Sequence, residues 1–196
     1  MLHPHTELRF VSEEIGYGIF ATAFIPKGTI MWVKDELDRI IPKEKISELS
    51  PANLENLLKY SYRTSMGDYF FCWDLTRYVN HSFNPNSMLT ALGFEIAIKD
   101  IQAGDEISND YGTLNIIEKF QCAHSPSINH REFVCPDDLS RFHAQWDALI
   151  ESAFQSLDGI EQPLDCFLDR HQKIQMSKIM AKELAIPSIL TNYYRI

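Results

Sequence analysis

Residues that could bind a small ligand gather in two short stretches of the chain. Gly16 and Gly18 flank Tyr17, and a glycine main chain can approach a ligand closely because it has no Cβ. Asn80 carries an amide that both donates and accepts hydrogen bonds, and His81 follows it. Each also has a structural explanation: the glycines suit a hairpin turn without a ligand, and a lone histidine is more often a hydrogen-bonded core residue. We expect a structural role for the imidazole of His81.

Three segments carry these residues in a fixed order. They are Gly16-Tyr17-Gly18-Ile19-Phe20-Ala21, Arg77-Tyr78-Val79-Asn80-His81-Ser82-Phe83-Asn84-Pro85-Asn86 and Gly104-Asp105-Glu106-Ile107-Ser108-Asn109-Asp110-Tyr111-Gly112. Their order and separation resemble the SET-domain protein-lysine methyltransferase family, and the second segment is the most specific of the three. The resemblance spans residues 14–112, somewhat over half of the chain.

The resemblance implies a fold that is mostly β with some α. In this β-clip fold, small curved sheets surround a pseudoknot, in which the chain after the third segment passes beneath a loop near the second. Threaded connections are rare in proteins, so this expectation depends on the resemblance alone.

The implied activity is methyl transfer from S-adenosyl-L-methionine to lysine side chains of a protein substrate. The residues that the resemblance assigns to the cofactor are Gly16, Tyr17, Gly18, Asn80, His81, Tyr111 and Phe120. Two alternatives stay open: a catalytically silent SET-like protein-interaction module, and a methyltransferase for another acceptor. The substrate protein, the number of methyl groups and the oligomeric state are not specified by these motifs.

Tyr111 is the predicted catalytic residue. Methyl transfer to lysine is an in-line displacement, which needs a neutral amine and accurate alignment. A lysine with a pKa of about 10.4 is rarely neutral at pH 7, but an apolar channel beside a positive cofactor lowers that pKa. A tyrosine hydroxyl can orient the amine and the methyl group, partly through weak C–H···O contacts.

Aromatic side chains should form the walls of the lysine channel, because they suit both the aliphatic stem and its cationic form. The candidates are Tyr17, Tyr78, Phe83 and Phe94, of which we expect at most two to line the channel. We assign Tyr78 and Asn109 to it. Many family members have an aromatic residue where Asn109 stands, so the smaller asparagine leaves the number of methyl groups open.

A zinc site is not expected. Many SET domains place a zinc-binding cysteine where this chain has Phe83, and the tail that supplies the other ligands is irregular here. Cysteine and histidine are good zinc ligands, so Cys122, His124, His130 and Cys135 remain an alternative four-ligand set. The favoured interpretation is a metal-free tail over the cofactor, with Phe120 beside the adenine ring.

Composition narrows the classes of function. The formal net charge of −9 disfavours direct binding to nucleic acid, and an acidic surface could attract a lysine-rich protein segment. No apolar run is long enough to span a bilayer, and no signal peptide precedes the first motif. The four cysteines have no disulfide-scaffold spacing. We therefore expect an intracellular protein without membrane contact, cytoplasmic, or nuclear or in a host cell if its substrate is chromatin.

The elements around the motifs follow from local patterns. Residues 29–33 and 94–98 have strand composition. Ser50 and Pro51 suit the start of a helix, and the helical insert is expected over about 42–64. A long apolar face runs through Leu139, Phe142, Trp146, Leu149, Ile150, Ala153, Phe154 and Leu157, and a further helix is expected over about 165–184.

These elements divide the chain into three predicted parts. Residues 1–116 form the SET domain, residues 117–135 a degenerate tail that follows it, and residues 136–196 a helical C-terminal segment. Whether that segment packs on the core, contacts a substrate or dimerises stays open.

Overall fold

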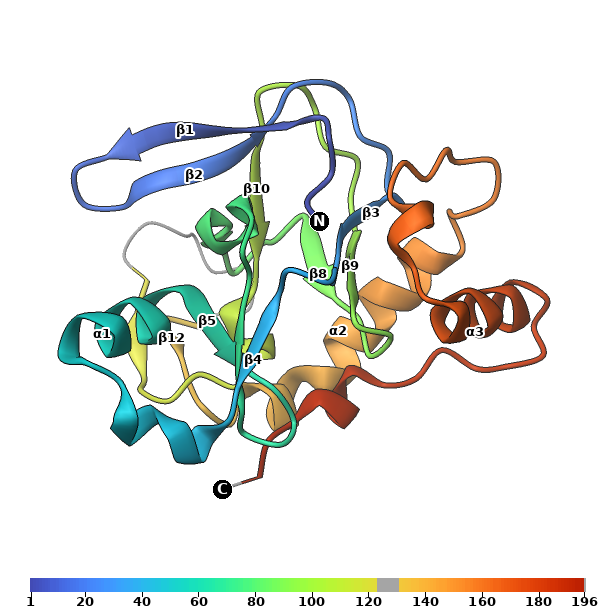
Figure 1. The fold of residues 1–196 in the computed structure, drawn as a ribbon. Coiled ribbons are helices and arrows are strands. Elements are labelled where there is room, and N and C mark those ends of the chain that lie inside the picture. Colours follow the sequence, from blue (N-terminus) through green and yellow to red (C-terminus); the bar gives the residue numbers. More distant parts are fainter. Residues whose placement is uncertain (123–130, 196) are drawn as a thin grey trace.

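The computed structural model describes residues 1–122 and 131–195, whose strands form small sheets (Figure 1). The sheet orders are β1-β2-β10-β7, β3-β9-β8, β4-β6-β5 and β11-β12. The strands are β1 (Thr6–Ser12), β2 (Gly16–Ala21), β3 (Ile30–Val33), β4 (Arg39–Ile41), β5 (Ser61–Arg63), β6 (Tyr69–Phe71), β7 (Asn80–His81), β8 (Ser87–Leu89), β9 (Phe94–Ala97), β10 (Glu106–Asn109), β11 (Phe120–Gln121) and β12 (Phe133–Val134). The predicted fold class, small sheets with additional helices, is confirmed.

The sheet β1-β2-β10-β7 brings the three sequence motifs together. Strand β10 pairs antiparallel with β2, where Ile107 lies opposite Ile19. On its other side β10 pairs parallel with β7, where Asn109 lies opposite His81. The ends of β7 and β10 thus lie side by side, although they are some thirty residues apart in the chain. Tyr111 follows shortly after the end of β10.

The helical insert consists of η1 (Lys43–Glu48) and α1 (Pro51–Tyr60). The Ser50 hydroxyl accepts a hydrogen bond from the backbone N–H of Asn53, so the predicted cap is confirmed. The helix ends at Tyr60 and the chain passes directly into β5. Tyr62 therefore belongs to a strand, where it stacks on Phe70, and the helical part of the insert ends before the predicted boundary at about residue 64.

The C-terminal segment packs on the core. Helix α2 (Asp138–Phe154) runs behind the sheet β3-β9-β8 (Figure 1), and its buried residues share one apolar cluster with that sheet. The cluster includes Ile30, Phe94, Ile96, Leu139, Trp146, Ile150 and Phe154. Leu149 was predicted on this face but is 38% exposed, because it lies at the margin of the apolar stripe.

The last helix is shorter than predicted. Helix α3 (Arg170–Met180) begins at a capping box formed by Asp169 and Gln172. Leu168 has extended backbone angles and separates α3 from η4 (Asp165–Phe167). The turn η5 (Ile189–Asn192) then returns to α2. No helix in the described residues is long and apolar enough to span a membrane.

Candidate active site

Tyr111 is held at both ends by the second motif. It begins the turn η3 (Tyr111–Thr113), which Asp110 caps by accepting a hydrogen bond from the Gly112 backbone. The Tyr111 hydroxyl donates to the carbonyl of Val79 over 2.7 Å. Its backbone N–H donates to Nδ1 of His81 over 3.1 Å. These bonds fix the orientation of the phenol ring.

The Tyr111 hydroxyl stays neutral. Burial raises the pKa of Tyr111 above its ordinary value, and the nearby carboxylates of Glu95 and Glu106 raise it further. A neutral phenol has one hydrogen, and the Val79 carbonyl accepts it. The oxygen lone pairs are therefore the part of Tyr111 that a ligand can use.

His81 is a neutral structural residue, as its sequence context suggested. Burial, together with the charge of Arg131, lowers the pKa of His81 to about 4. The neutral ring uses Nδ1 as the acceptor for Tyr111. Its faces and edges contact the rings of Phe83 and Phe120, with centroids 4.5 and 5.9 Å away.

Asn80 connects the first motif to the third. Its Nδ2 donates to the carbonyl of Tyr17 over 3.1 Å and to Oε1 of Glu106 over 2.7 Å. A Cβ on Gly18 would collide with both the Asn80 amide and the Glu106 carboxylate. The absence of a Cβ on Gly18 thus makes room for these two side chains, and its role toward a ligand stays a prediction. Gly16 has a φ of +84° and open space where a Cβ would be.

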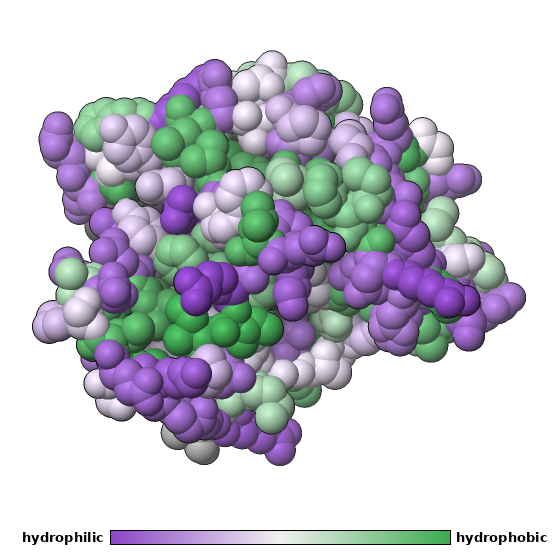
Figure 2. Space-filling model, viewed as in Figure 1, coloured by the Kyte–Doolittle hydropathy of each residue, from purple (hydrophilic) through white to green (hydrophobic). Residues whose placement is uncertain are grey.

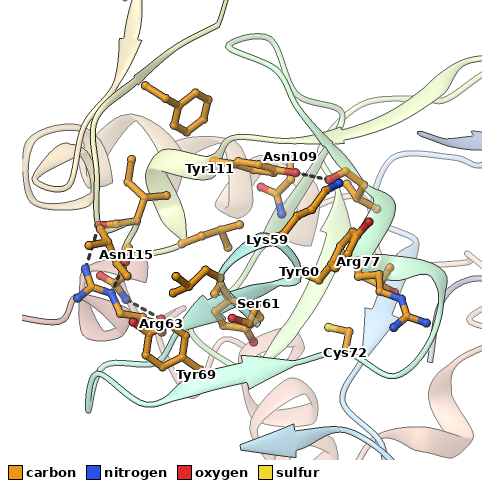
Figure 3. Close-up of a pocket in the computed structure, with 18 of the residues that line it drawn as sticks. Lys59, Tyr60, Ser61, Arg63, Tyr69, Cys72, Arg77, Asn109, Tyr111 and Asn115 are labelled. Atoms are coloured by element: carbon orange, nitrogen blue, oxygen red, sulfur yellow. Dashed lines mark hydrogen bonds between the residues drawn. The ribbon is translucent and has the colours of Figure 1, made fainter. Parts of the chain in front are cut away.

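A cavity of about 460 Å³ opens beside Tyr111 (Figure 3). In the close-up, Tyr111 and Asn109 lie next to each other in its wall, opposite the end of α1 and strand β5. Figure 2 shows apolar surface between polar bands over this part of the molecule. The lining side chains include the aromatic residues Trp32, Tyr60, Tyr62, Tyr69 and Phe120 and the carboxylates Glu95 and Glu118.

Buried polar atoms without partners concentrate at this cavity. Within residues 1–122 and 131–195, the lining residues Trp32, Thr76, Arg77 and Asn109 each contribute one buried nitrogen or oxygen that forms no hydrogen bond. Such atoms are uncommon because burying them unpaired costs free energy.

The family follows from the sequence comparison. The sequence model of the SET domain matches residues 16–112, the stretch that contains β2, β7, β10 and Tyr111. The chain is a SET-domain protein. A solved structure of a candidate histone methyltransferase from Plasmodium falciparum is similar at 22% identity, with a TM-score of 0.40, and the match covers 56% of this chain and 95% of that one. No curated protein matches.

S-adenosylmethionine, the methyl donor that SET-domain methyltransferases generally use, fits the residues around Gly16. Its ammonium and sulfonium groups are positive, and this side of the SET domain is rich in acceptors: the Tyr17 carbonyl and the Glu106 carboxylate meet at Asn80. No described residue donates a hydrogen bond to Oδ1 of Asn80. The ring of Phe120 is 36% exposed and can cover an adenine.

The predicted site residues separate into two groups. Asn109, Tyr111 and Phe120 line the cavity, whereas Gly16, Tyr17, Gly18, Asn80 and His81 lie outside its walls. Tyr78 also lies outside, with its ring between those of Tyr60 and Tyr17 at 5.5 and 6.2 Å. Tyr111 connects the two groups, because it lines the cavity and its backbone N–H donates to His81.

The predicted aromatic walls were wrong in detail. Phe83 and Phe94 are 5% and 0% exposed and belong to the packed interior. Besides Tyr111 and Phe120, the cavity is lined by four aromatic residues from β3, the end of α1, β5 and β6: Trp32, Tyr60, Tyr62 and Tyr69. Their positions depend on how these elements pack together, for which the sequence carries no local signal.

Arg131 joins the C-terminal part of the chain to the catalytic turn. Its guanidinium forms buried ion pairs with Asp110, which precedes Tyr111, and with Asp138 at the start of α2. It also lies 4.8 Å from the ring centroid of Phe83. Burial raises the pKa of Asp110, and the hydrogen bonds and charge of Arg131 oppose that shift. The network fixes Asp110 and with it the direction of Tyr111.

Two of the four residues of the alternative zinc site fall in the described part of the chain, Cys122 and Cys135. His124 and His130 lie outside the described residues. Cys135 has its backbone N–H bonded to Asp138, and Phe83 fills the position of the family's cysteine by packing on His81. The absence of zinc stays a prediction.

Proposed function

We propose that the protein transfers methyl groups from S-adenosyl-L-methionine to lysine side chains of a protein substrate. The observation that carries this proposal is the position of Tyr111. Its hydroxyl lies in the wall of a partly aromatic cavity, and its backbone is bonded to the Asn80-His81 segment that the family uses for the cofactor. A residue placed between two sites can align groups that arrive from both sides.

The chain holds the two reactants in different ways. Tyr17, Asn80 and Glu106 supply acceptors for the positive groups of the cofactor, and Phe120 supplies an aromatic face. Once bound there, S-adenosylmethionine supplies a methyl group on a positively charged sulfur.

The cavity suits the lysine side chain. Trp32, Tyr60 and Tyr62 offer aromatic surface to an aliphatic stem and a cationic head. Removing the amine from water lowers its pKa, so the neutral, nucleophilic form becomes accessible. The lone pairs of the Tyr111 oxygen can then accept a hydrogen bond from the amine and orient its remaining lone pair.

The acceptor and its location follow from the same proposal. The cavity opens at a surface with the exposed apolar residues Leu58, Ile117 and Phe120, which suits a folded or extended protein segment that presents a lysine. We infer an intracellular protein acceptor and no direct contact with nucleic acid or membrane.

A methyl-transfer screen tests the proposal. The purified protein is incubated with methyl-labelled cofactor and a whole-proteome extract, and labelled proteins are digested to identify the modified amino acid. We expect label in methylated lysine that disappears with Tyr111→Phe. Label on another residue type would show a different acceptor, and no label with intact cofactor binding would favour the silent interaction module.

A further inference from the structure

Glu95 is a buried carboxyl in the wall of the cavity. It lies on β9 among apolar neighbours and is 8% exposed. Its Oε2 accepts a hydrogen bond from the Ser87 hydroxyl at 3.1 Å, and its Oε1 accepts one from Nδ2 of Asn109 at 2.9 Å. Both oxygens retain acceptor capacity. Neither the family resemblance nor the motifs assigned Glu95 a role.

No cation in the described part of the chain balances Glu95. The ionisable groups that influence it or are influenced by it are Tyr62, Cys72, Asp74 and Tyr111, which are neutral or negative. Lys59, Arg63 and Arg77 line the cavity, but none forms an ion pair with Glu95. A buried carboxylate without a cation is costly, so its presence points to a positive ligand or to proton uptake.

Burial gives Glu95 an unusual acidity. It raises the pKa of Glu95 to about 7, and the hydrogen bonds from Ser87 and Asn109 only partly oppose the shift. A carboxyl with this pKa exchanges its proton readily near neutral pH, which is the requirement for a general base.

The substrate supplies the complementary group. A lysine ammonium that enters the cavity places a positive charge near a negative one in a site of low dielectric. Transfer of one proton converts this ion pair into two neutral groups, which such surroundings tolerate better. The amine also loses part of its affinity for the proton through desolvation. Both effects favour the transfer.

We propose that Glu95 accepts the proton that the substrate lysine loses before its amine is methylated. One N–H bond of the ammonium breaks, one O–H bond forms on Glu95, and the electron pair stays on nitrogen as the nucleophile. The proton then leaves to solvent through the open side of the cavity. This role rests on the proposed function, because it presumes that a lysine enters the cavity.

Glu95→Gln tests the role, because the amide keeps the size of the side chain and can accept from Asn109 and donate to the Ser87 hydroxyl oxygen, but it cannot accept the proton. With an acceptor found in the screen, the wild-type rate should rise through about pH 7, following the pKa of Glu95. The variant should be slower by about 100-fold near neutral pH, and its rate should not rise through pH 7. Its rate should recover in part at alkaline pH. In Ser87→Ala the rate should still rise with pH, but at a higher pH than in the wild type, because the variant removes a hydrogen bond to the charged form of Glu95.

A second measurement needs no methyl transfer. The carboxyl carbons of glutamate are labelled with ¹³C in the full chain, the Glu95 signal is assigned by its loss in Glu95→Gln, and butylamine serves as the probe for a lysine side chain. We expect the Glu95 signal to titrate near neutral pH and to respond to butylamine. A signal that ignores butylamine, or a variant that keeps the wild-type rate and pH profile, would overturn the role of Glu95. A wild-type protein that methylates nothing would instead count against the proposed function.

Discussion

The side-chain amide of Asn109 donates a hydrogen bond to the carboxylate of Glu95 over 2.9 Å, in the cavity wall beside Tyr111. Many SET domains have an aromatic residue at the position of Asn109. Here the asparagine is small, leaves its Oδ1 without a partner among the described residues, and stabilises a buried acid. The asparagine therefore affects both the size of the cavity and the hydrogen bonding of its buried carboxyl.

The size of Asn109 predicts products beyond monomethyl-lysine. A methylated amine is bulkier and must turn to present its lone pair again, which a small side chain permits. Asn109→Phe should shift the product distribution towards one methyl group. It should leave the first transfer largely intact only at alkaline pH, because it also removes the hydrogen bond that stabilises the charged form of Glu95. Asn109→Ala, which also loses the contact with Glu95 but keeps the space, should still produce higher methylation. Mass spectrometry of the modified substrate distinguishes these results, and a wild-type protein that stops at one methyl group would refute the size argument.

The buried carboxyl of Glu95 should also make the stability of the protein depend on pH. Because the pKa of Glu95 is raised from 4.5 to about 7 on folding, the folded protein binds more protons than the unfolded chain between these values. Stability should therefore decline as pH rises through this window. Glu95→Gln removes this dependence and should stabilise the protein at pH 8, by at most about 3 kcal/mol.

Urea unfolding at pH 5 and pH 8 measures this effect. Glu55→Gln, an exposed change of the same type on α1, should leave the difference between the two pH values as it is in the wild type. An unchanged difference in Glu95→Gln would mean that Glu95 is charged in the folded protein at pH 5.

Asn80 should contribute to the binding of S-adenosylmethionine. Its amide joins the Tyr17 carbonyl to Glu106, so Asn80→Ala removes both an acceptor and the support of the turn. We expect calorimetry to show weaker binding of S-adenosylmethionine by about 1–3 kcal/mol. Asn56→Ala, on the exposed side of α1, is the control. Equal affinity in the Asn80 variant would place the cofactor elsewhere.

The Arg131 network predicts a large loss of stability. Arg131→Met leaves the carboxylates of Asp110 and Asp138 buried without their partner, which typically costs about 3–5 kcal/mol. Arg141→Met offers a matched control, since Arg141 is 54% exposed and pairs only at long distance with Asp137 and Asp138. Its effect should stay within about 1 kcal/mol. Comparable losses in the two variants would contradict a structural role for the buried network.

The sequence predicted what depends on motifs and local capping. The SET fold follows from the three segments, and the strand at Ile30–Val33 and the Ser50 cap follow from side-chain type. Helix α2 was found because its apolar residues repeat at helical spacing over more than four turns. These signals are local, or belong to a family pattern that the chain retains.

The cavity walls could not be predicted in the same way. Trp32, Tyr62 and Glu95 come from different sheets and meet only through tertiary packing. Glu95 in particular is the second residue of the strand-like run Phe94–Ile98, where a carboxylate predicts an exposed position. Its partners Ser87 and Asn109 are 8 and 14 residues away, so nothing near it in the sequence reveals that it is buried.

Tyr111→Phe tests the central claim most directly. The hydroxyl contacts the Val79 carbonyl and the cavity, so its removal should affect the aligned transition state more than cofactor binding. With an acceptor protein from the screen, we predict turnover lower by about 100-fold or more, which corresponds to about 2.7 kcal/mol. Affinity for S-adenosylmethionine should stay within a few-fold by calorimetry. Full activity in Tyr111→Phe would contradict the assignment of Tyr111 as the catalytic residue.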